Sequence, residues 1–509
     1  MVASYNFNKA LAAKAWGAAA SLDPDCAVCQ WGVAYAHAPF LNAPILEGAG
    51  AQAAYQAAAR KAAAVAAAKG LAGPAAGLVA AIVARLDAPR LDAPEAAALY
   101  RVKATEAAGR FPNAVDLQVL AAEAVMLEHC DSDGYHFLGP EGNLVPALAR
   151  VVAALGALQG AEHPLGLHLL IHATEMLPAT TRPGEGAGRG AFAAEKLRER
   201  FEKLGAGHLQ HMPSHVFLRT GRYAEAVAAN ERAHATNLEF LKHGVDCYGL
   251  EHNAAFLAWT AGQGGLREAA VGASEFLYRT YSRAAPSTPN NATVLAQLRV
   301  ASPLTTFVRF GLWDDVLGWT AALPEGWPYS RALAHFARGL ALVHTAPPRP
   351  QAAEWELDAL LKLDVAGPYA AMATLALRGA LALATGADPQ TGLGHLRRAV
   401  DTLRALPYDE PPTWFMPLAA CEGQVRLDAG DAAGAYAAFA EDLQDYPEGP
   451  WALHGMAAAM ERLPGRFSRE AVAAVRRRAA AAWHGGAAGG AGPPSACPAF
   501  AGLAAEAPA

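Results

Sequence analysis

Histidine is concentrated in one part of this 509-residue chain. Nine of its 17 histidines lie within residues 163–252, where an even distribution would place about three. Three polar residues in this stretch, His168, His172 and Glu175, have the spacing i, i+4 and i+7. If the segment is helical, this spacing puts all three side chains on one face of the helix.

A second group has nearly the same pattern. His208, His211 and His215 are spaced i, i+3 and i+7, which is again one face of a continuous helix. Pro213 interrupts that helix, because proline lacks the N–H that an interior turn needs. Two arrangements stay open: the helix begins at Pro213 and leaves the first two histidines on the preceding turn, or it is kinked there. In either arrangement His208 is the weakest candidate of the three.

The two groups together could bind a transition metal. Two imidazoles one helical turn apart can chelate a single ion, and a carboxylate one turn further can complete the ligand set or act as a general base. Two such helices facing each other would supply a mononuclear site with an open position, or a dinuclear site. The candidate metal ligands are His168, His172, His208, His211, His215 and His252, and the candidate catalytic carboxylates are Glu175 and Glu123.

The spacing leaves the metal open between iron, copper and zinc, because all three accept imidazole ligands. A set of five or six histidines suits oxidation by copper or iron. A three-ligand set with a bound water suits zinc hydrolysis, in which the metal lowers the pKa of that water toward about 7. The alternative is a set of hydrogen-bonded core histidines. Repetition of the spacing on two helices, with Glu175 in phase, favours the metal site.

Two of the candidates, His252 and Glu123, lie outside the two regularly spaced groups. His252 lies in the sequence Glu251-His252-Asn253, one repeat beyond the second group. Glu123 lies in an apolar helical segment, where a buried carboxylate needs a partner. Spacing alone does not decide whether this carboxylate is buried and paired or exposed to solvent.

Helices must hold these side chains, and the composition predicts an all-α fold. Hydrophobic residues make up 53% of the chain and charged residues only 17%, with alanine abundant in their place. Alanine is the best helix former, and the apolar periodicity is helical nearly throughout. A formal net charge of −6 argues against a nucleic-acid partner. We find neither a membrane span nor a secretory signal, and therefore expect a cytoplasmic protein.

The helices repeat. The run Gly221-Arg222-Tyr223-Ala224-Glu225-Ala226 is a turn followed by a helix with small residues at packing positions. A second copy contains Ala435, Phe439 and Pro447. These spacings match the tetratricopeptide (TPR) repeat, whose stacked helix pairs form an α-solenoid with a concave face.

The predicted organisation is one TPR-like solenoid followed by a tail. The solenoid covers residues 5–483, with a His-rich core at 163–253 and C-terminal repeats at about 390–465. Residues 484–509 are rich in glycine, alanine and proline, and we expect them to be disordered. Six cysteines are too few for a disulfide scaffold in a chain of this length. We expect the lone pair Cys26 and Cys29 to pack in a helix rather than to bind zinc or to act as a redox pair.

Several motifs resemble one family nearly end to end. The most specific are the HxxxHxxE pattern at residues 168–175 and the GHxxHMPSH pattern at 207–215, followed by Gly221-Arg222-Tyr223. The chain is similar to a family of bacterial-type TPR-repeat proteins that carries them. The resemblance implies an α-solenoid and includes these His and Glu positions, but it implies no activity. The chain departs from the family at Phe40, where the family has Asn, and at residues 417–420, where the family has an Arg.

Three functions compete. The first is a metal-dependent oxidoreductase or hydrolase that takes a small molecule or a peptide in the concave groove. The second is a scaffold that binds a protein partner, which is the usual role of TPR solenoids. The third is a protein that stores or senses metal without turnover. The His and Glu clusters favour the enzyme, since peptide-clamping TPR grooves are instead rich in Lys, Arg and Asn.

Overall fold

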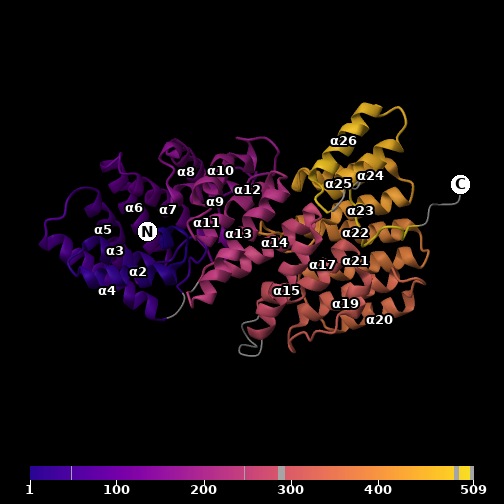
Figure 1. Cartoon of the computed structure of the whole chain (residues 1–509), viewed down its shortest axis with the longest axis horizontal. Helices are drawn as coiled ribbons and strands as arrows, with labels where there is room; N and C mark the ends of the chain where they lie inside the picture. Colours follow the sequence, from indigo (N-terminus) through magenta and orange to yellow (C-terminus); the bar gives the residue numbers. More distant parts are fainter. Residues whose placement is uncertain (47–48, 246, 285–292, 486–491, 505–509) are drawn as a thin grey trace. The chain divides into compact units, whose positions relative to one another are not determined.

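The computed structural model describes residues 1–46, 49–245, 247–284, 293–485 and 492–504. These residues are mostly helical, which confirms the all-α prediction (Figure 1). The strands among them form one short antiparallel hairpin, β1 (Cys130–Asp131) and β2 (Gly134–Tyr135). Within the described part of the chain, no helix has the length and apolar character needed to cross a membrane.

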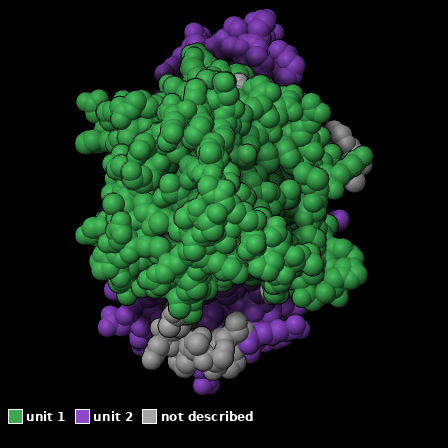
Figure 2. All heavy atoms as spheres, turned by 90° about the vertical axis from the view of Figure 1, so that its left-hand side faces the viewer, with its two compact units in different colours: residues 1–178, 182–216, 231–250 green, residues 179–181, 217–230, 251–509 purple. Residues whose placement is uncertain are grey.

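The chain divides into two compact units, which Figure 2 colours separately. Unit 1 comprises residues 1–178, 182–216 and 231–250, and unit 2 comprises residues 179–181, 217–230 and 251–509. Each unit is described by itself below. The continuous solenoid over residues 5–483 stays a prediction.

Unit 1 contains the first part of the helix series. Its helices are α1 (Val2–Tyr5), α2 (Lys9–Leu22), α3 (Ala27–Ala36), α4 (Ala49–Ala68), α5 (Gly73–Ala84), α6 (Pro94–Arg110), α7 (Val115–Leu127), α8 (Pro146–Ala157), α9 (Pro164–Glu175), α10 (Ala191–Phe201) and α11 (Gly207–His211). Short 3₁₀ helices lie at Arg85–Asp87, Gln159–Ala161 and Gly186–Gly190. Successive helices pack against each other, as α2 does with α3 and α6 with α7. Helices α12 (Pro213–Arg219), α13 (Tyr223–Lys242) and α14 (Leu250–Gly264) contribute residues to both units.

Unit 2 continues the series. Its helices are α15 (Arg267–Ala284), α16 (Val294–Val300), α17 (Ser302–Phe310), α18 (Trp313–Gly318), α19 (Pro328–Val343), α20 (Pro350–Lys362), α21 (Pro368–Ala384), α22 (Pro389–Arg404), α23 (Leu418–Asp428), α24 (Ala432–Asp445), α25 (Pro450–Glu461) and α26 (Arg469–Ala482). Five of these helices begin with proline, whose fixed φ suits the first helical turn, where its missing N–H has no intrahelical partner. Neighbouring helices again pack in sequence, as α21 does with α22 and α23 with α24.

The predicted disorder of residues 484–509 is wrong for residues 492–504. This segment packs into the core of unit 2, where Ala496, Ala499 and Phe500 have no exposed surface. The composition was misleading because the few apolar side chains of the segment join a core built by other helices. Apart from residues 484 and 485, the rest of the predicted tail lies outside the described residues.

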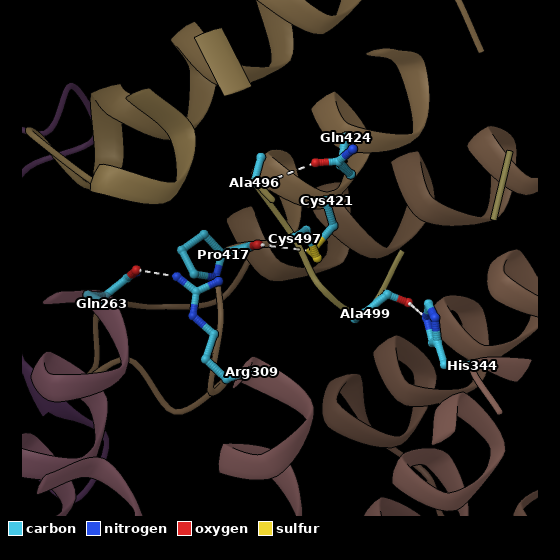
Figure 3. Close-up of a disulfide and its surroundings, with 9 residues drawn as sticks. All are labelled: Gln263, Arg309, His344, Pro417, Cys421, Gln424, Ala496, Cys497 and Ala499. Atoms are coloured by element: carbon cyan, nitrogen blue, oxygen red, sulfur yellow. Dashed lines mark hydrogen bonds between the residues drawn. A yellow bond between two sulfur atoms is a disulfide. The ribbon is translucent and has the colours of Figure 1, made fainter. Parts of the chain in front are cut away.

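A disulfide holds the same segment. Cys497 is bonded to Cys421 on α23, and the backbone N–H of Ala496 donates to Oε1 of Gln424 at 2.9 Å (Figure 3). A second disulfide joins Cys26 and Cys29, which we expected to pack as thiols. Spacing did not show either bond, because sequence alone does not give disulfide connectivity. Disulfides are typical of oxidising compartments, so the cytoplasmic location stays a prediction.

Candidate metal centre

Helix α9 carries the first histidine group, as the spacing predicted. His163 precedes the helix and its Nδ1 accepts the backbone N–H of Gly166 at 3.2 Å, while Pro164 is the first helical residue. His168, His172 and Glu175 follow on the same helix, and none of the three side chains has exposed surface. Three buried polar groups on one helix require partners, because an unpaired buried polar group is costly.

The partners of this group form a chain of polar contacts. The backbone carbonyl of Tyr5 lies 2.9 Å from Nδ1 of His168. The Nε2 atoms of His168 and His172 are 3.1 Å apart, and Nδ1 of His172 lies 2.8 Å from Oε1 of Glu175. This series of polar contacts therefore runs from the backbone carbonyl of Tyr5 through two imidazoles to the carboxylate of Glu175.

The second group lies on two helices. The five-residue helix α11 ends at His211, and α12 begins at Pro213, so the first of the two predicted arrangements is confirmed. Gly207 opens α11 beneath Asn237, whose Oδ1 would lie 2.1 Å from a Cβ at that position. A side chain at residue 207 would therefore require the Asn237 amide to move.

His208 joins the first group rather than the second. One ligand nitrogen from each of His168, His172 and His208 lies within 4.8 Å of the others, and all three residues are buried. The ring centroids of His168 and His208 are 4.8 Å apart. The residue that the sequence ranked lowest in its group thus lies in a cluster of three histidines.

His211 and His215 form a second imidazole pair, with their Nε2 atoms 2.8 Å apart. Nδ1 of His215 lies 2.8 Å from Oε2 of Glu175. Each oxygen of this carboxylate therefore faces an imidazole nitrogen. Oε1 faces His172 on α9, and Oε2 faces His215 on α12. The role of Glu175 as a metal ligand or base stays a prediction, and this placement between two imidazoles also suits a carboxylate that orients histidines.

The partners of the first pair fix where its protons lie. A carbonyl oxygen can only accept, so Nδ1 of His168 must carry the proton that it shares with Tyr5. An ionised Glu175 also only accepts, so Nδ1 of His172 must carry a proton too. When both rings are neutral, their Nε2 atoms are therefore two lone pairs facing each other at 3.1 Å. Two facing acceptors repel unless a cation lies between them.

The pKa shifts concern the carboxylate of Glu175 and the ring of His168. Burial alone would raise the pKa of Glu175, but the imidazoles of His172 and His215 outweigh it and hold that pKa well below its usual range. Burial, with a smaller contribution from His172, lowers the pKa of His168 well below that of a free imidazole. The centre thus combines an ionised carboxylate with an imidazole kept neutral.

The geometry fits a metal ion. Zinc–imidazole bonds are about 2.0–2.1 Å long, so an ion bound to both Nε2 atoms of the first pair would have them about 100° apart. That angle is close to the tetrahedral value. His208 supplies the third nitrogen of the cluster, which leaves a fourth position for water or substrate.

The N-terminus contributes residues that the sequence analysis missed. Besides the carbonyl of Tyr5, Oδ1 of Asn6 accepts the backbone N–H of Leu209 at 2.8 Å. Phe7 has a φ of 56°, in the left-handed region that is strained for a bulky side chain. The polar and aromatic run before α2 was the available signal, but no spacing rule connects it to a helix more than 150 residues away.

Aromatic side chains surround the three histidines. The ring of Phe7 has no exposed surface, and its centroid lies 4.3 Å from that of His168 and 5.6 Å from that of His208. Phe40 packs on Phe7 at 5.0 Å and on Tyr248 at 5.8 Å. Phe40 thus adds a second apolar ring next to Phe7.

Glu123 is buried and paired, but with tyrosines. Its carboxylate accepts hydrogen bonds from the hydroxyls of Tyr35 at 2.6 Å and Tyr100 at 3.4 Å. Burial lowers the pKa of the nearby Lys9 to about 8, partly offset by the charge of Glu123. Within the described residues, Glu123 belongs to none of the groups whose potential ligand atoms converge. Its proposed catalytic role therefore has no support from the geometry.

His252 belongs to unit 2. It lies on α14, half-buried, with its ring centroid 5.3 Å from that of Phe256. Its place in a metal site stays a prediction. The centre described above consists of unit 1 residues alone.

Comparison with known proteins assigns the chain to no family. No model of a known protein family matches the chain, and no curated protein matches it. The chemistry of the centre must therefore be argued from its own side chains.

Proposed function

We propose that unit 1 is a metal-dependent catalytic domain whose ion is bound by His168, His172 and His208. The observation that carries this proposal is the approach of two Nε2 lone pairs to 3.1 Å, with the proton of each ring engaged on the opposite nitrogen. A cation between the two nitrogens removes the repulsion. On the His168 side a proton is disfavoured, because burial lowers the pKa of that imidazole.

The donor set favours iron, copper or zinc. All three donors are imidazole nitrogens, which suit these metals, whereas magnesium, calcium and manganese prefer oxygen ligands. A metal bound by three histidines can supply a Lewis acid and an activated water, or a redox centre, at its open position. The reaction we propose is therefore hydrolytic with zinc or oxidative with copper or iron.

The residues around the donors have separate tasks in this proposal. Glu175 accepts from Nδ1 of His172 through Oε1, which fixes the tautomer of that ring and aims its Nε2 at the ion, and its Oε2 lies 2.8 Å from Nδ1 of His215. Phe7 covers two of the three donor rings and keeps bulk water away from them. His211 and His215 form a second pair at 2.8 Å, which makes them the candidates for a second ion that shares Glu175 with the first.

Elemental mass spectrometry on untagged protein tests the proposal. We expect about one or two equivalents of iron, copper or zinc per chain, absent from a His172→Ala/His208→Ala variant. The control is His243→Ala, which removes an exposed histidine that pairs with Glu239. Metal-free preparations that also fail to bind added zinc, copper or iron would contradict the proposal.

The metal found then decides between the reaction classes. Zinc directs the screen to ester and amide hydrolysis, and copper or iron directs it to oxidation with dioxygen. A stoichiometric metal without any turnover would support storage or sensing and contradict catalysis. The scaffold alternative stays a prediction, and partner binding that survives loss of the three histidines would support it.

We also infer that α23–α26 are TPR-like repeats. Each of these helices packs against the next, and Phe439 on α24 lies against two glycines, one on each neighbouring helix. A Cβ at Gly423 or Gly455 would lie within about 2.5 Å of the Phe439 ring. Small residues opposite a large one are typical of TPR packing. A crystal structure in which α23–α24 does not superpose on α25–α26 would contradict this inference.

A further inference from the structure

Unit 2 contains a cavity of about 780 Å³, including the part that is open to solvent. Side chains from α14, α16, α17 and α19 line it, together with the loop at residues 410–415. Much of the wall is apolar, with Trp259, Leu298, Leu333 and Trp414 among the lining residues. An apolar wall that also carries a few polar groups suits a small organic molecule rather than a single ion.

Arg309 lines this cavity and is almost completely buried, with 2% of its surface exposed. Its Nη2 donates to Oε1 of Gln263 at 2.6 Å (Figure 3), and its guanidinium lies 4.3 Å from the centroid of the Trp451 ring. Its Nη1 has no hydrogen-bond acceptor among the described residues. A buried guanidinium with an unused donor is costly unless another molecule satisfies it.

Two further lining residues have the same deficit. Arg299 donates from Nη1 to the hydroxyl of Tyr281 at 2.6 Å, but its buried Nε has no acceptor. The indole N–H of Trp414 is also buried without one. Neither Arg299 nor Arg309 forms an ion pair with a carboxylate in the part of the chain that the structure describes. The wall of the cavity therefore has unused donors, and its two arginines outnumber its one carboxylate, Glu410. The charge of the neighbouring Asp409 acts on Arg299 without forming an ion pair among the described residues.

We propose that this cavity binds a small organic anion, a carboxylate on an apolar body. The carboxylate accepts from Arg309 and Arg299, and the apolar body packs on Trp259 and Trp414. Arginine suits this task because its planar guanidinium can donate two parallel hydrogen bonds to one carboxylate. The site lies within unit 2 and does not depend on the metal centre of unit 1.

Acidic neighbours do not take the place of such a ligand. Glu410 also lines the cavity, and its Oε2 accepts from the hydroxyl of Tyr408 at 2.8 Å. Asp442 on α24 is the carboxylate whose charge acts on Arg309, but the two form no ion pair. The positive charge of Arg309 is thus only partly compensated from within the chain.

Calorimetric titration with three probes tests the proposal on the full-length protein. Dodecanoate and 2-naphthoate share the carboxylate and differ in the body, whereas methyl dodecanoate keeps the body and lacks the charge. We expect one of the two carboxylates, or both, to bind in a one-to-one complex and the ester to bind at least tenfold more weakly. The comparison of the two carboxylates shows whether the body is aliphatic or aromatic. Equal binding of ester and acid, or no binding of either acid, would overturn the proposal.

Variants locate the site. Arg309→Met and Arg299→Met keep an apolar side chain of similar length, and each is expected to weaken binding about 10- to 100-fold, the loss of one charge-assisted contact. The control is Arg478→Met, which removes an arginine that pairs with Glu448 on the surface. Arg299 is only half-buried, so its variant tests the site even if Arg309→Met does not fold. Unchanged affinity in Arg299→Met would overturn the proposal.

Discussion

Glu175 in unit 1 and Asp442 in unit 2 are both buried helical carboxylates, but the two units treat them differently. Each oxygen of Glu175 lies 2.8 Å from an imidazole nitrogen, and the pKa of its carboxyl is lowered. Burial raises the pKa of Asp442 to about 7, and its Oδ1 has no donor among the described residues. Burial disfavours the charge of both carboxylates. Imidazoles offset this effect at Glu175 in unit 1, but no group fully offsets it at Asp442 in unit 2.

The difference follows from where the partners lie. His172 is three residues before Glu175 on the same helix, so local geometry alone brings donor and acceptor together. Arg309 lies on α17 and Asp442 on α24, and they do not form an ion pair. In unit 1 the imidazoles of His168 and His172 direct their Nε2 lone pairs toward a place suited to a cation. In unit 2 the unused N–H donors of Arg309 and Arg299 suit an anion.

Glu175→Ala is expected to have the largest effect. The substitution removes the acceptor of the His172 Nδ1–H and the buried ion-pair partner of His215, so the free energy of unfolding should fall by about 3–5 kcal/mol. Metal affinity should fall about 10- to 100-fold through loss of the orienting carboxylate. Denaturant unfolding and metal titration measure the two. Glu239→Ala, at an exposed pair with Lys242, serves as the control, and an effect no larger than the control would remove the distinction between the units.

Removal of the Cys421–Cys497 disulfide is expected to be the next largest effect. Its cysteines are 76 residues apart, and the double Cys→Ala variant should lose about 2–4 kcal/mol of unfolding free energy. The matched comparison in unit 1 is Cys26–Cys29, three residues apart, where the closed loop is short and the loss should be smaller. Equal losses in thermal unfolding would show that residues 492–504 do not depend on their covalent attachment.

Asp442→Asn tests the unsatisfied carboxylate through pH. The folded-state pKa of about 7 lies above the ordinary value of 3.8, so the folded state binds the proton more tightly than the unfolded state does. The wild type should therefore lose stability as pH rises from about 4 to about 7, at up to about 1.4 kcal/mol per unit. The neutral amide should not. Parallel slopes for the two proteins in urea unfolding from pH 4 to pH 8 would contradict the raised pKa.

Two groups of charges act on that titration. Arg309 favours the ionised form of Asp442, while Asp445 and Glu441 on the same helix oppose it. An anion bound at Arg309 would weaken the favourable contribution. The slope should therefore be measured without added carboxylic acids.

His163→Ala is expected to have the smallest effect. His163 caps α9 and contacts Asp116 at 3.0 Å, but it is not a proposed ligand. Loss of the cap should cost about 1 kcal/mol, without change in metal content. Metal content should be measured beside that of His172→Ala. If His163→Ala also lost its metal, any disturbance of α9 would release the ion, and the loss in His172→Ala would not identify that residue as a ligand.

The local part of the site was predictable from the sequence. The 3.6-residue period placed His168, His172 and Glu175 on one helix face, and the proline rule located the break before α12. The all-α fold was also predictable, because composition and apolar periodicity are properties of short segments and do not depend on tertiary contacts. Spacing also identified Glu175 as part of the group of polar side chains around the histidines.

The contacts between distant segments were not predictable. Tyr5, Asn6 and Phe7 reach the histidines only through tertiary packing, and the burial of residues 492–504 depends on a core that other helices build. The unsatisfied donors at Arg309 are a property of packing as well, because no sequence pattern reveals which partners a side chain lacks.

The most direct test of the central claim is histidine ¹⁵N NMR on metal-free and zinc-loaded protein. The account predicts that His168 and His172 carry their protons on Nδ1 and that only their Nε2 resonances shift strongly when zinc binds. Assignments come from His168→Ala and His172→Ala variants. A proton shared between the two Nε2 atoms, with no change on addition of zinc, would show that the pair binds a proton and would contradict the metal centre.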